Sequence, residues 1–342
     1  MKSRIQYIDI AKGIGILLVV FGHSRLVLDT KGELFNVIFS FHMPLFFFLS
    51  GIFFNPTITF PNLLARRAKS LLRPYFVTLF LVGIGYYVLS GPFSLGQFLY
   101  GILYGVGATI AWGPFVTWGP LWFLPHLFLI FVVAWLLLRL LGLTSESGIG
   151  RKYSLLAALL VIGVVVIGRF WQITIQFNNQ PLILWGLPLG LDIVLITTAY
   201  FLLGYFSRQH LAKQLAQPKW LLLSAALFIG LHAYFNLTID FNIRQYDHLV
   251  ISTVQALAGI HLVLATSQLI AQYGGWLSNG LRQLGERSLI IFILHGYIQY
   301  ESFLWLNQRS PDRYVFNGII AFLLGVFVPV LFDLIRGLQR KK

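Results

Sequence analysis

Apolar residues run in ten long stretches along the chain, and short polar segments separate them. Each stretch can cross the roughly 30 Å hydrocarbon core of a bilayer as an α-helix, which takes about 20 residues. The pattern therefore predicts an all-α, polytopic integral membrane bundle of about ten transmembrane helices. The expected spans are residues 8–25, 34–54, 74–91, 120–140, 154–170, 188–206, 219–236, 249–272, 288–305 and 315–335.

Residues 92–119 are also apolar, but glycines interrupt them. If they do not span, 19 of the 25 basic residues fall on the side of the N-terminus; if they span, only 11 do. Cytoplasmic loops are enriched in Lys and Arg, so we expect both termini in the cytoplasm and an outer re-entrant or interfacial hairpin over 92–119. The basic residues left on the outer side are Arg25, Lys31, Arg169, Arg244, Arg309 and Arg313.

Composition agrees with a membrane protein. Of 342 residues, 57% are hydrophobic and 11% are charged, whereas soluble domains carry about 25% charged residues. The net charge of +14 lies in short loops between apolar spans, which is a topology signal and not a nucleic-acid site. The absence of cysteine excludes disulfides and thiolate chemistry. We expect one membrane domain over residues 1–342, with no appended soluble domain.

Lys12 and His23 are the first candidate site residues, within RIQYIDIAKGIGILLVVFGH. Eleven positions separate them, which is three helical turns plus about 20°, so they share one helix face with a rise of about 16 Å. Ionisable groups in membrane helices are costly and usually functional. Lys12 can also be a snorkelling anchor and His23 a headgroup histidine. Counting along this helix predicts Lys12 at the cytoplasmic foot and His23 near the outer surface.

Three further ionisable residues lie inside predicted spans. His42 sits beside the kink expected at Pro44, within FHMPLFFFLSGIFF. Asp192, in GLPLGLDIVL, either orients a histidine on a neighbouring helix or caps its own helix N-terminus. His295, in SLIIFILHGYI, is expected about 10 Å from the inner end of its span.

Four cations, Arg66, Arg67, Lys69 and Arg73, crowd the segment LLARRAKSLLRPYF before Pro74. They retain this loop in the cytoplasm or bind an anionic ligand, since Arg forks match phosphate oxygens. A Gly-rich phosphate loop is absent, so side chains would hold such a ligand.

Trp122 and Phe123 begin the fourth span, in GPLWFLPHLF. They predict an aromatic outer vestibule that suits a glycan-like acceptor. HExxH, GxSxG and a glycosidase-like acid pair are all missing from the sequence, and no metal-ligand spacing occurs.

Taken together, these motifs resemble membrane-bound acyltransferase family 3, and within it the fucose 4-O-acetylase-like branch. The resemblance covers essentially the whole chain. Its most specific element is a basic residue ten positions before a histidine, here Lys12 and His23. The other elements are FHMPLFFFLSGIFF, RRxxxxxRPYF, LWFLPHLF and SLIIFILHG, in this order.

The resemblance implies transfer of an acyl group, commonly acetyl from acetyl-CoA, onto a hydroxyl of an extracytoplasmic or lipid-linked carbohydrate. It implies that His23 is the catalytic histidine and Lys12 its companion. As our own hypothesis, Asp192 or His42 orients the imidazole of His23.

By the same resemblance, the basic cluster Arg66, Arg67 and Arg73 would bind the CoA phosphates, and Trp122 and Phe123 match an element that we expect to contact substrate. We expect His295 to contact substrate as well. Acetyl-CoA is then a substrate and not a tightly bound cofactor, and no metal is expected. The other partners are the carbohydrate acceptor and the lipid bilayer, in a multi-pass protein of the bacterial cytoplasmic membrane.

Two features depart from the family pattern. Many relatives have Arg where this chain has Lys12, and Lys offers a point charge without a bidentate fork, which leaves room for a local charge role. Some relatives carry a soluble esterase-like domain after the last helix, whereas this chain ends at Lys342. We therefore expect it to act alone or to pass its acyl group to a separate partner.

Two other functions fit part of the pattern. A transporter or flippase of an anionic or lipid-linked glycan would use the same basic cytoplasmic mouth, but it would release no CoA. A glycosyltransferase using a polyprenyl-phosphate sugar would need an acidic residue in an outer loop. The candidates for that residue are Asp29, Glu33, Asp240 and Asp247.

Overall fold

A computed structural model describes residues 6–177, 180–208 and 215–339 of the chain. The cytoplasmic charges assigned from sequence to Lys2, Arg4, Lys213, Arg340, Lys341 and Lys342 lie outside these residues.

The chain forms two compact units. Unit 1 comprises Met1–Phe46, Leu211–Ile239 and Val250–Lys342, and unit 2 comprises Phe47–His210 and Asp240–Leu249. Helix α4 (His42–Ile52) begins in unit 1 and ends in unit 2. The single domain expected over 1–342 stays a prediction.

The predicted all-α membrane bundle is confirmed. Within the described residues, nine helices are long and apolar enough to cross a membrane: Glu33–Ile52, Phe60–Ser90, Gly113–Leu140, Ile149–Val166, Pro188–Ser207, Pro218–Phe235, Leu249–Tyr273, Ser288–Arg309 and Pro311–Leu338. Helix α1 (Gln6–Gly22) has 17 residues and a length of about 25 Å. It corresponds to the first of the ten predicted spans.

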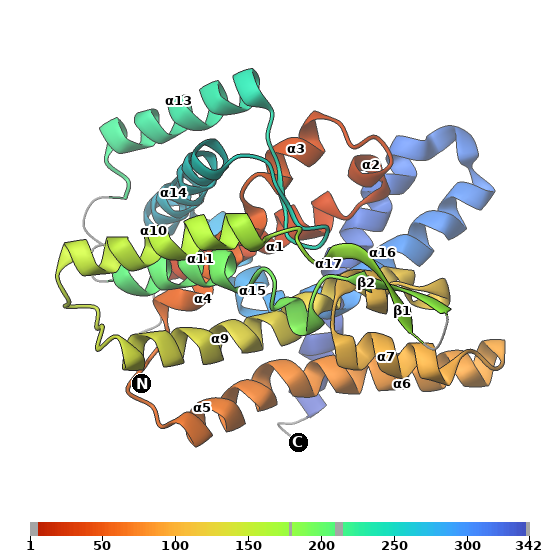
Figure 1. Cartoon of the computed structure of the whole chain (residues 1–342). Helices are drawn as coiled ribbons and strands as arrows, with labels where there is room; N and C mark the ends of the chain where they lie inside the picture. The colour runs from red at the N-terminus through yellow and green to blue at the C-terminus, as the bar shows by residue number, and fades with distance from the viewer. Residues whose placement is uncertain (1–5, 178–179, 209–214, 340–342) are drawn as a thin grey trace. The chain divides into compact units, whose positions relative to one another are not determined.

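The described residues of unit 1 form helices and the loops between them, and Ile239 is its one strand residue. Besides α1, its helices are α2 (Arg25–Leu28), α3 (Glu33–Phe39), α13 (Pro218–Phe235), α14 (Leu249–Tyr273), α15 (Gly275–Glu286), α16 (Ser288–Arg309), the 3-10 turn η4 (Pro311–Arg313) and α17 (Tyr314–Gln339). Figure 1 shows α16 and α17 packed side by side. Ile16, Val20, Ile291 and Val326 form an apolar core among α1, α16 and α17.

Helix α1 packs against α15 and also contacts α16. Gly13 faces the carbonyl of Leu281, and Gly285 faces the carbonyl of Asp9. A methyl group at either glycine would overlap the opposing backbone. Small residues of this kind let membrane helices approach closely, and here they fix the register between the two segments.

Unit 2 holds the remaining elements. They are α5 (Phe60–Arg67), the π-turn η1 (Ala68–Leu72), α6 (Arg73–Ser90), α7 (Leu95–Tyr104), α8 (Gly107–Ile110), the 3-10 helix η2 (Gly113–Trp122), α9 (Phe123–Leu140), α10 (Ile149–Val166), β1 (Trp171–Phe177), β2 (Gln180–Trp185), the 3-10 turn η3 (Pro188–Gly190), α11 (Val194–Ser207) and β4 (Gln245–Tyr246); β3 (Ile239–Asp240) straddles the boundary. The end of α4 packs on α11 through reciprocal glycines, with Gly51 against the Phe201 carbonyl and Gly204 against the Phe48 carbonyl.

The third predicted span begins earlier than expected. The sequence places its start at Pro74, whereas the helix runs from Phe60 to Ser90 with a π-turn at Ala68–Leu72. Proline removes one backbone hydrogen bond and crowds the carbonyl four residues before it. A π-turn absorbs such a defect without ending the helix.

Residues 92–119 contain only short helices, as a non-spanning segment requires. Helix α7 has 10 residues, a length of about 15 Å, and it ends at Gly105 in the left-handed conformation, φ +67°. Half a bilayer is the most that this helix can cross, which agrees with the predicted hairpin.

A strand pair and one helix were not predicted. Strands β1 and β2 form an antiparallel pair that places Trp171 opposite Trp185, where the sequence was assigned to the loop between the fifth and sixth spans. The amphipathic helix α15 occupies residues assigned to a loop. Both are shorter than a transmembrane span, so a search for long apolar stretches passes over them.

Candidate active site

Three of the predicted histidines meet in unit 1. His23 follows the last residue of α1, His42 begins α4, and His295 lies on α16. The rings of His23 and His295 are 5.4 Å apart between centroids. The ring of Phe39 contacts both His23 and His42, with centroids 6.2 Å and 4.6 Å apart respectively.

The same helical contact fixes the tautomer of all three rings. The Nδ1 atom of His23 lies 2.9 Å from the Val19 carbonyl oxygen, and Nδ1 of His42 lies 2.9 Å from that of Ile38. Nδ1 of His295 lies 2.8 Å from the carbonyl oxygen of Phe292. A carbonyl only accepts, so each Nδ1 carries a proton, and each neutral ring keeps a lone pair on Nε2.

His23 is the accessible member of this cluster. Its side chain is half-buried, whereas His42 and His295 are 2% and 1% exposed. Of the three lone pairs, the one on His23 is therefore the one that a substrate can reach most readily.

The depth predicted for His23 stays a prediction. His23 and His295 are in ring contact. Helix α16 begins seven residues before His295 and continues for 14 residues beyond it, about 10 Å and 21 Å respectively.

Lys12 pairs with an acid that sequence reasoning missed. Its Nζ lies 3.3 Å from Oδ1 of Asp9, whose side chain is 6% exposed. The spacing of three within one helix places such a pair on one face, and this signal in the sequence could have identified it. Lys12 thus neutralises a buried carboxylate. This is the local charge role that remained possible because the chain has Lys at position 12 where many relatives have Arg.

The predicted basic cluster lies in unit 2, around the π-turn. Arg66 lies in the last turn of α5 and Arg73 begins α6, and both side chains are exposed. Arg67 is half-buried, with its guanidinium 3.7 Å from the centroid of the Phe131 ring. This cation–π contact fixes Arg67 and leaves Arg66 and Arg73 open to an anion.

Asp192 contacts an arginine and not a histidine. It lies in the turn before α11, where Oδ2 accepts from Nε of Arg244 at 2.8 Å and Oδ1 accepts from Nη2 at 3.1 Å. Oδ1 also accepts from the backbone N–H of Leu187 at 3.1 Å. Both carboxylate oxygens are occupied by these hydrogen bonds. The catalytic role expected for Asp192 stays a prediction. Its partner lies 52 residues away, and no local pattern could reveal it.

The aromatic residues of the fourth span are packed. Trp122 is 5% exposed and stacks on His126, with centroids 5.4 Å apart, and Phe123 lies 5.4 Å from Phe47. His126 uses both ring nitrogens, at 2.8 Å from the Leu189 carbonyl oxygen and 3.0 Å from the Thr197 hydroxyl. These contacts are structural; the substrate contacts expected of Trp122 and Phe123 stay predictions.

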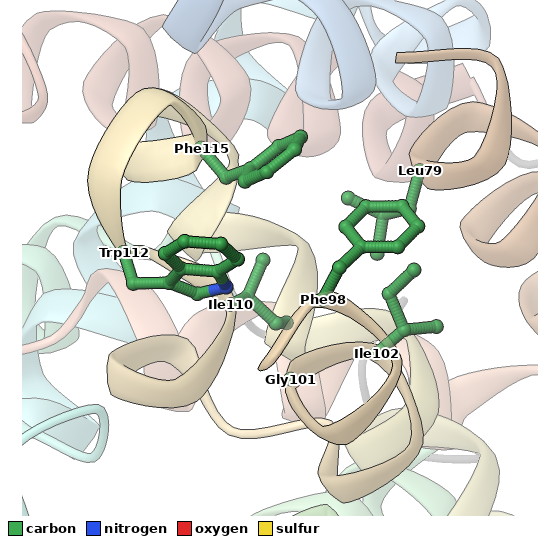
Figure 2. A pocket seen from close by; sticks show the side chains of 7 residues that line it. All are labelled: Leu79, Phe98, Gly101, Ile102, Ile110, Trp112 and Phe115. Carbon is green, nitrogen blue, oxygen red and sulfur yellow. The ribbon is translucent and has the colours of Figure 1, made fainter. Parts of the chain in front are cut away.

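A small apolar cavity lies among α6, α7, α8 and η2 (Figure 2). Its volume is about 10 Å³, room for one water-sized molecule and not for a substrate. The lining residues are Leu79, Phe98, Gly101, Ile102, Ile110, Trp112 and Phe115. Among residues 6–177, 180–208 and 215–339, no three His, Cys, Asp or Glu side chains are grouped to hold a metal ion.

Comparison with protein families decides the relationship of the chain. A family model described as an acyltransferase domain, that of acyltransferase family 3, matches residues 5–334. The chain belongs to this family. Searches among curated proteins and solved structures gave no match.

Because the chain belongs to acyltransferase family 3 and has long apolar helices, it is a membrane acyltransferase. The fucose 4-O-acetylase-like branch stays a prediction. For an acyltransferase, the chemically useful groups are the lone pair of His23 in unit 1 and the exposed arginines of unit 2.

Proposed function

We propose that the protein transfers an acetyl group from cytoplasmic acetyl-CoA to a hydroxyl of an extracytoplasmic or lipid-linked carbohydrate. The observation that carries this proposal is the hydrogen bond from His23 Nδ1 to the Val19 carbonyl, 2.9 Å long. It leaves Nε2 as a proton acceptor in a half-buried position, which is what a general base requires.

In the proposed reaction, His23 Nε2 removes the proton of the acceptor hydroxyl as its oxygen attacks the thioester carbonyl carbon. The tetrahedral intermediate collapses, the carbon–sulfur bond breaks, and CoA leaves as a thiolate. The imidazolium of His23 then gives its proton to the sulfur. During the step the Val19 carbonyl faces the Nδ1 proton of a cationic ring and stabilises it.

The exposed guanidinium groups of Arg66 and Arg73 support an anionic donor, and we propose that they bind the CoA phosphates. Arg67, held over Phe131, would keep this segment ordered and add its charge. His42 shares the contact with Phe39, and we propose that it positions the His23 ring through that phenyl group.

The test measures CoA release from acetyl-CoA by purified protein in liposomes supplied with crude cell-envelope glycan. We expect glycan-stimulated release in the wild type and its loss, by about 10²–10⁴-fold, in His23→Ala. The matched control is His261→Ala, which removes another half-buried histidine of unit 1, one that bonds Ser224 at 2.9 Å. This control should retain release.

Full activity of His23→Ala would refute the role of the histidine. Absence of CoA release from the folded wild type with any glycan or acyl donor would refute acetyl transfer and favour a glycan flippase.

A further inference from the structure

Three buried hydrogen-bond acceptors on α16 lack partners among the described residues: Nε2 of His295, Oε1 of Gln299 and Oδ1 of Asn307. The side chains of His295 and Gln299 are the most deeply buried of the three residues, at 1% and 2% exposed. They lie four residues apart, so they occupy one face of the helix in successive turns.

Both atoms require a hydrogen-bond donor. The Nδ1 proton of His295 is committed to the carbonyls of Phe292 and Ile291, at 2.8 and 3.2 Å, so neutral His295 can only accept at Nε2. An amide oxygen also only accepts. A buried acceptor left unsatisfied costs about 1–3 kcal/mol.

The amide group of Gln299 lies close to Gly325 and to the apolar side chain of Val20. A Cβ placed on Gly325 would lie 3.3 Å from Oε1 of Gln299 and 3.4 Å from Cγ1 of Val20. Val20 belongs to the apolar core of unit 1. A methionine would fill this position without an unsatisfied polar atom.

We propose that His295 and Gln299 form the acceptor subsite, where they accept hydrogen bonds from hydroxyl groups next to the one that His23 deprotonates. This inference rests on the proposed function. The ring contact between His295 and His23, at 5.4 Å, places one acceptor beside the general base. A thioester carbonyl has no proton to donate, whereas a sugar presents several adjacent hydroxyls. The subsite therefore selects a substrate with several hydroxyl groups. A substrate with a single hydroxyl group would leave Nε2 of His295 or Oε1 of Gln299 without a hydrogen-bond donor.

The test combines stability with acceptor selectivity. Gln299→Met should be at least as thermally stable as the wild type, because it replaces an unsatisfied amide by an apolar side chain of similar length. With methyl glycopyranosides as acceptors, the wild type should prefer at least one parent glycoside over a monodeoxy counterpart by about tenfold to a hundredfold in kcat/KM. Gln299→Met should lose that preference and retain activity toward the deoxy acceptor.

Two further variants make the result specific. Gly325→Ala keeps the amide but crowds it, so it should weaken the same preference. Gln255→Met removes an equally buried amide of unit 1, whose Nε2 lies 3.3 Å from His232 Nδ1, and it should leave the preference unchanged.

The outcomes separate the two proposals. An unchanged deoxy preference in Gln299→Met, or a marked loss of its thermal stability, would overturn the subsite even if His23→Ala is inactive. A wild type that accepts no methyl glycopyranoside, while His23-dependent CoA release occurs with envelope glycan, would also overturn it. Loss of the His23 requirement itself would overturn the proposed function.

Discussion

The buried ion pair of Asp192 and Arg244 gives the sharpest prediction about unit 2. Their side chains are 0% and 1% exposed, and the guanidinium also donates to the Asn242 carbonyl at 2.9 Å. It lies 4.9 Å from the Trp171 ring centroid, and it packs on Gly186, where a side chain would collide with it. One arginine thus ties the turn before α11 to the β1–β2 pair and the 240–249 loop.

Arg244→Met should be strongly destabilising because it leaves a buried carboxylate with one backbone donor. Removing one partner of a buried ion pair costs about 3–5 kcal/mol. In Asp192→Asn/Arg244→Met the remaining side chain is neutral and Oδ1 can still accept from Leu187, so the cost should fall to about 1–3 kcal/mol. Asp192→Asn alone leaves the buried guanidinium without its counter-ion, at a similar cost. The two single-variant costs should therefore sum to more than the double-variant cost by at least about 2 kcal/mol.

The assay is a double-mutant cycle on the free energy of unfolding in mixed micelles, with CoA release measured per folded molecule. A structural pair predicts that the double variant regains both stability and activity. Additive single-variant effects would refute the coupling. A double variant that is folded yet inactive would show that Asp192 acts in catalysis, as the sequence first suggested.

Three further predictions concern other packed polar groups and glycines. Lys12→Met should destabilise unit 1 by about 1–3 kcal/mol because it removes the cation 3.3 Å from Oδ1 of buried Asp9, and the cost is below that of a fully buried pair because Lys12 is 29% exposed; adding Asp9→Asn should recover part of this in the same unfolding assay. Gly13→Val should abolish the folded monomer in size-exclusion chromatography, since a Cβ there overlaps a backbone carbonyl; a normal profile would contradict the α1–α15 register. His126→Leu should cost about 1–3 kcal/mol by removing two hydrogen bonds without raising KM for acetyl-CoA, and a raised KM would indicate a substrate contact.

The sequence predicts the membrane helices well because length and apolarity suffice for that purpose. Each of the nine candidate helices overlaps a predicted span, and residues 92–119 contain no helix long enough to cross. The sequence does not predict features that depend on contacts with other parts of the chain or on how a helix accommodates a proline. The extension of the third span back to Phe60 depends on how a helix absorbs Pro74, and α15 exists beside α1 because facing glycines admit it.

The sequence likewise predicts only part of the candidate site. Residues that share a helix could be related by counting, as with Lys12 and His23, and Asp9 could have been added by the same means. The contact of His23 with His295 joins segments 272 positions apart, and the pair of Asp192 with Arg244 is equally invisible to spacing.

In the part of the chain that the structure describes, backbone carbonyls and not carboxylates accept from the Nδ1 atoms of His23, His42 and His295, and the location inside a membrane protein explains why. A carboxylate beside His23 would add a charge to an apolar span, at a cost of several kcal/mol. The two buried acids of the described residues, Asp9 and Asp192, are each paired with a cation instead. The Val19 carbonyl already accepts the backbone N–H of His23 at 3.0 Å, and its second lone pair receives the Nδ1 proton. The helix thereby fixes the tautomer with a neutral group, and charge arises on the imidazole only when it takes a proton from the acceptor.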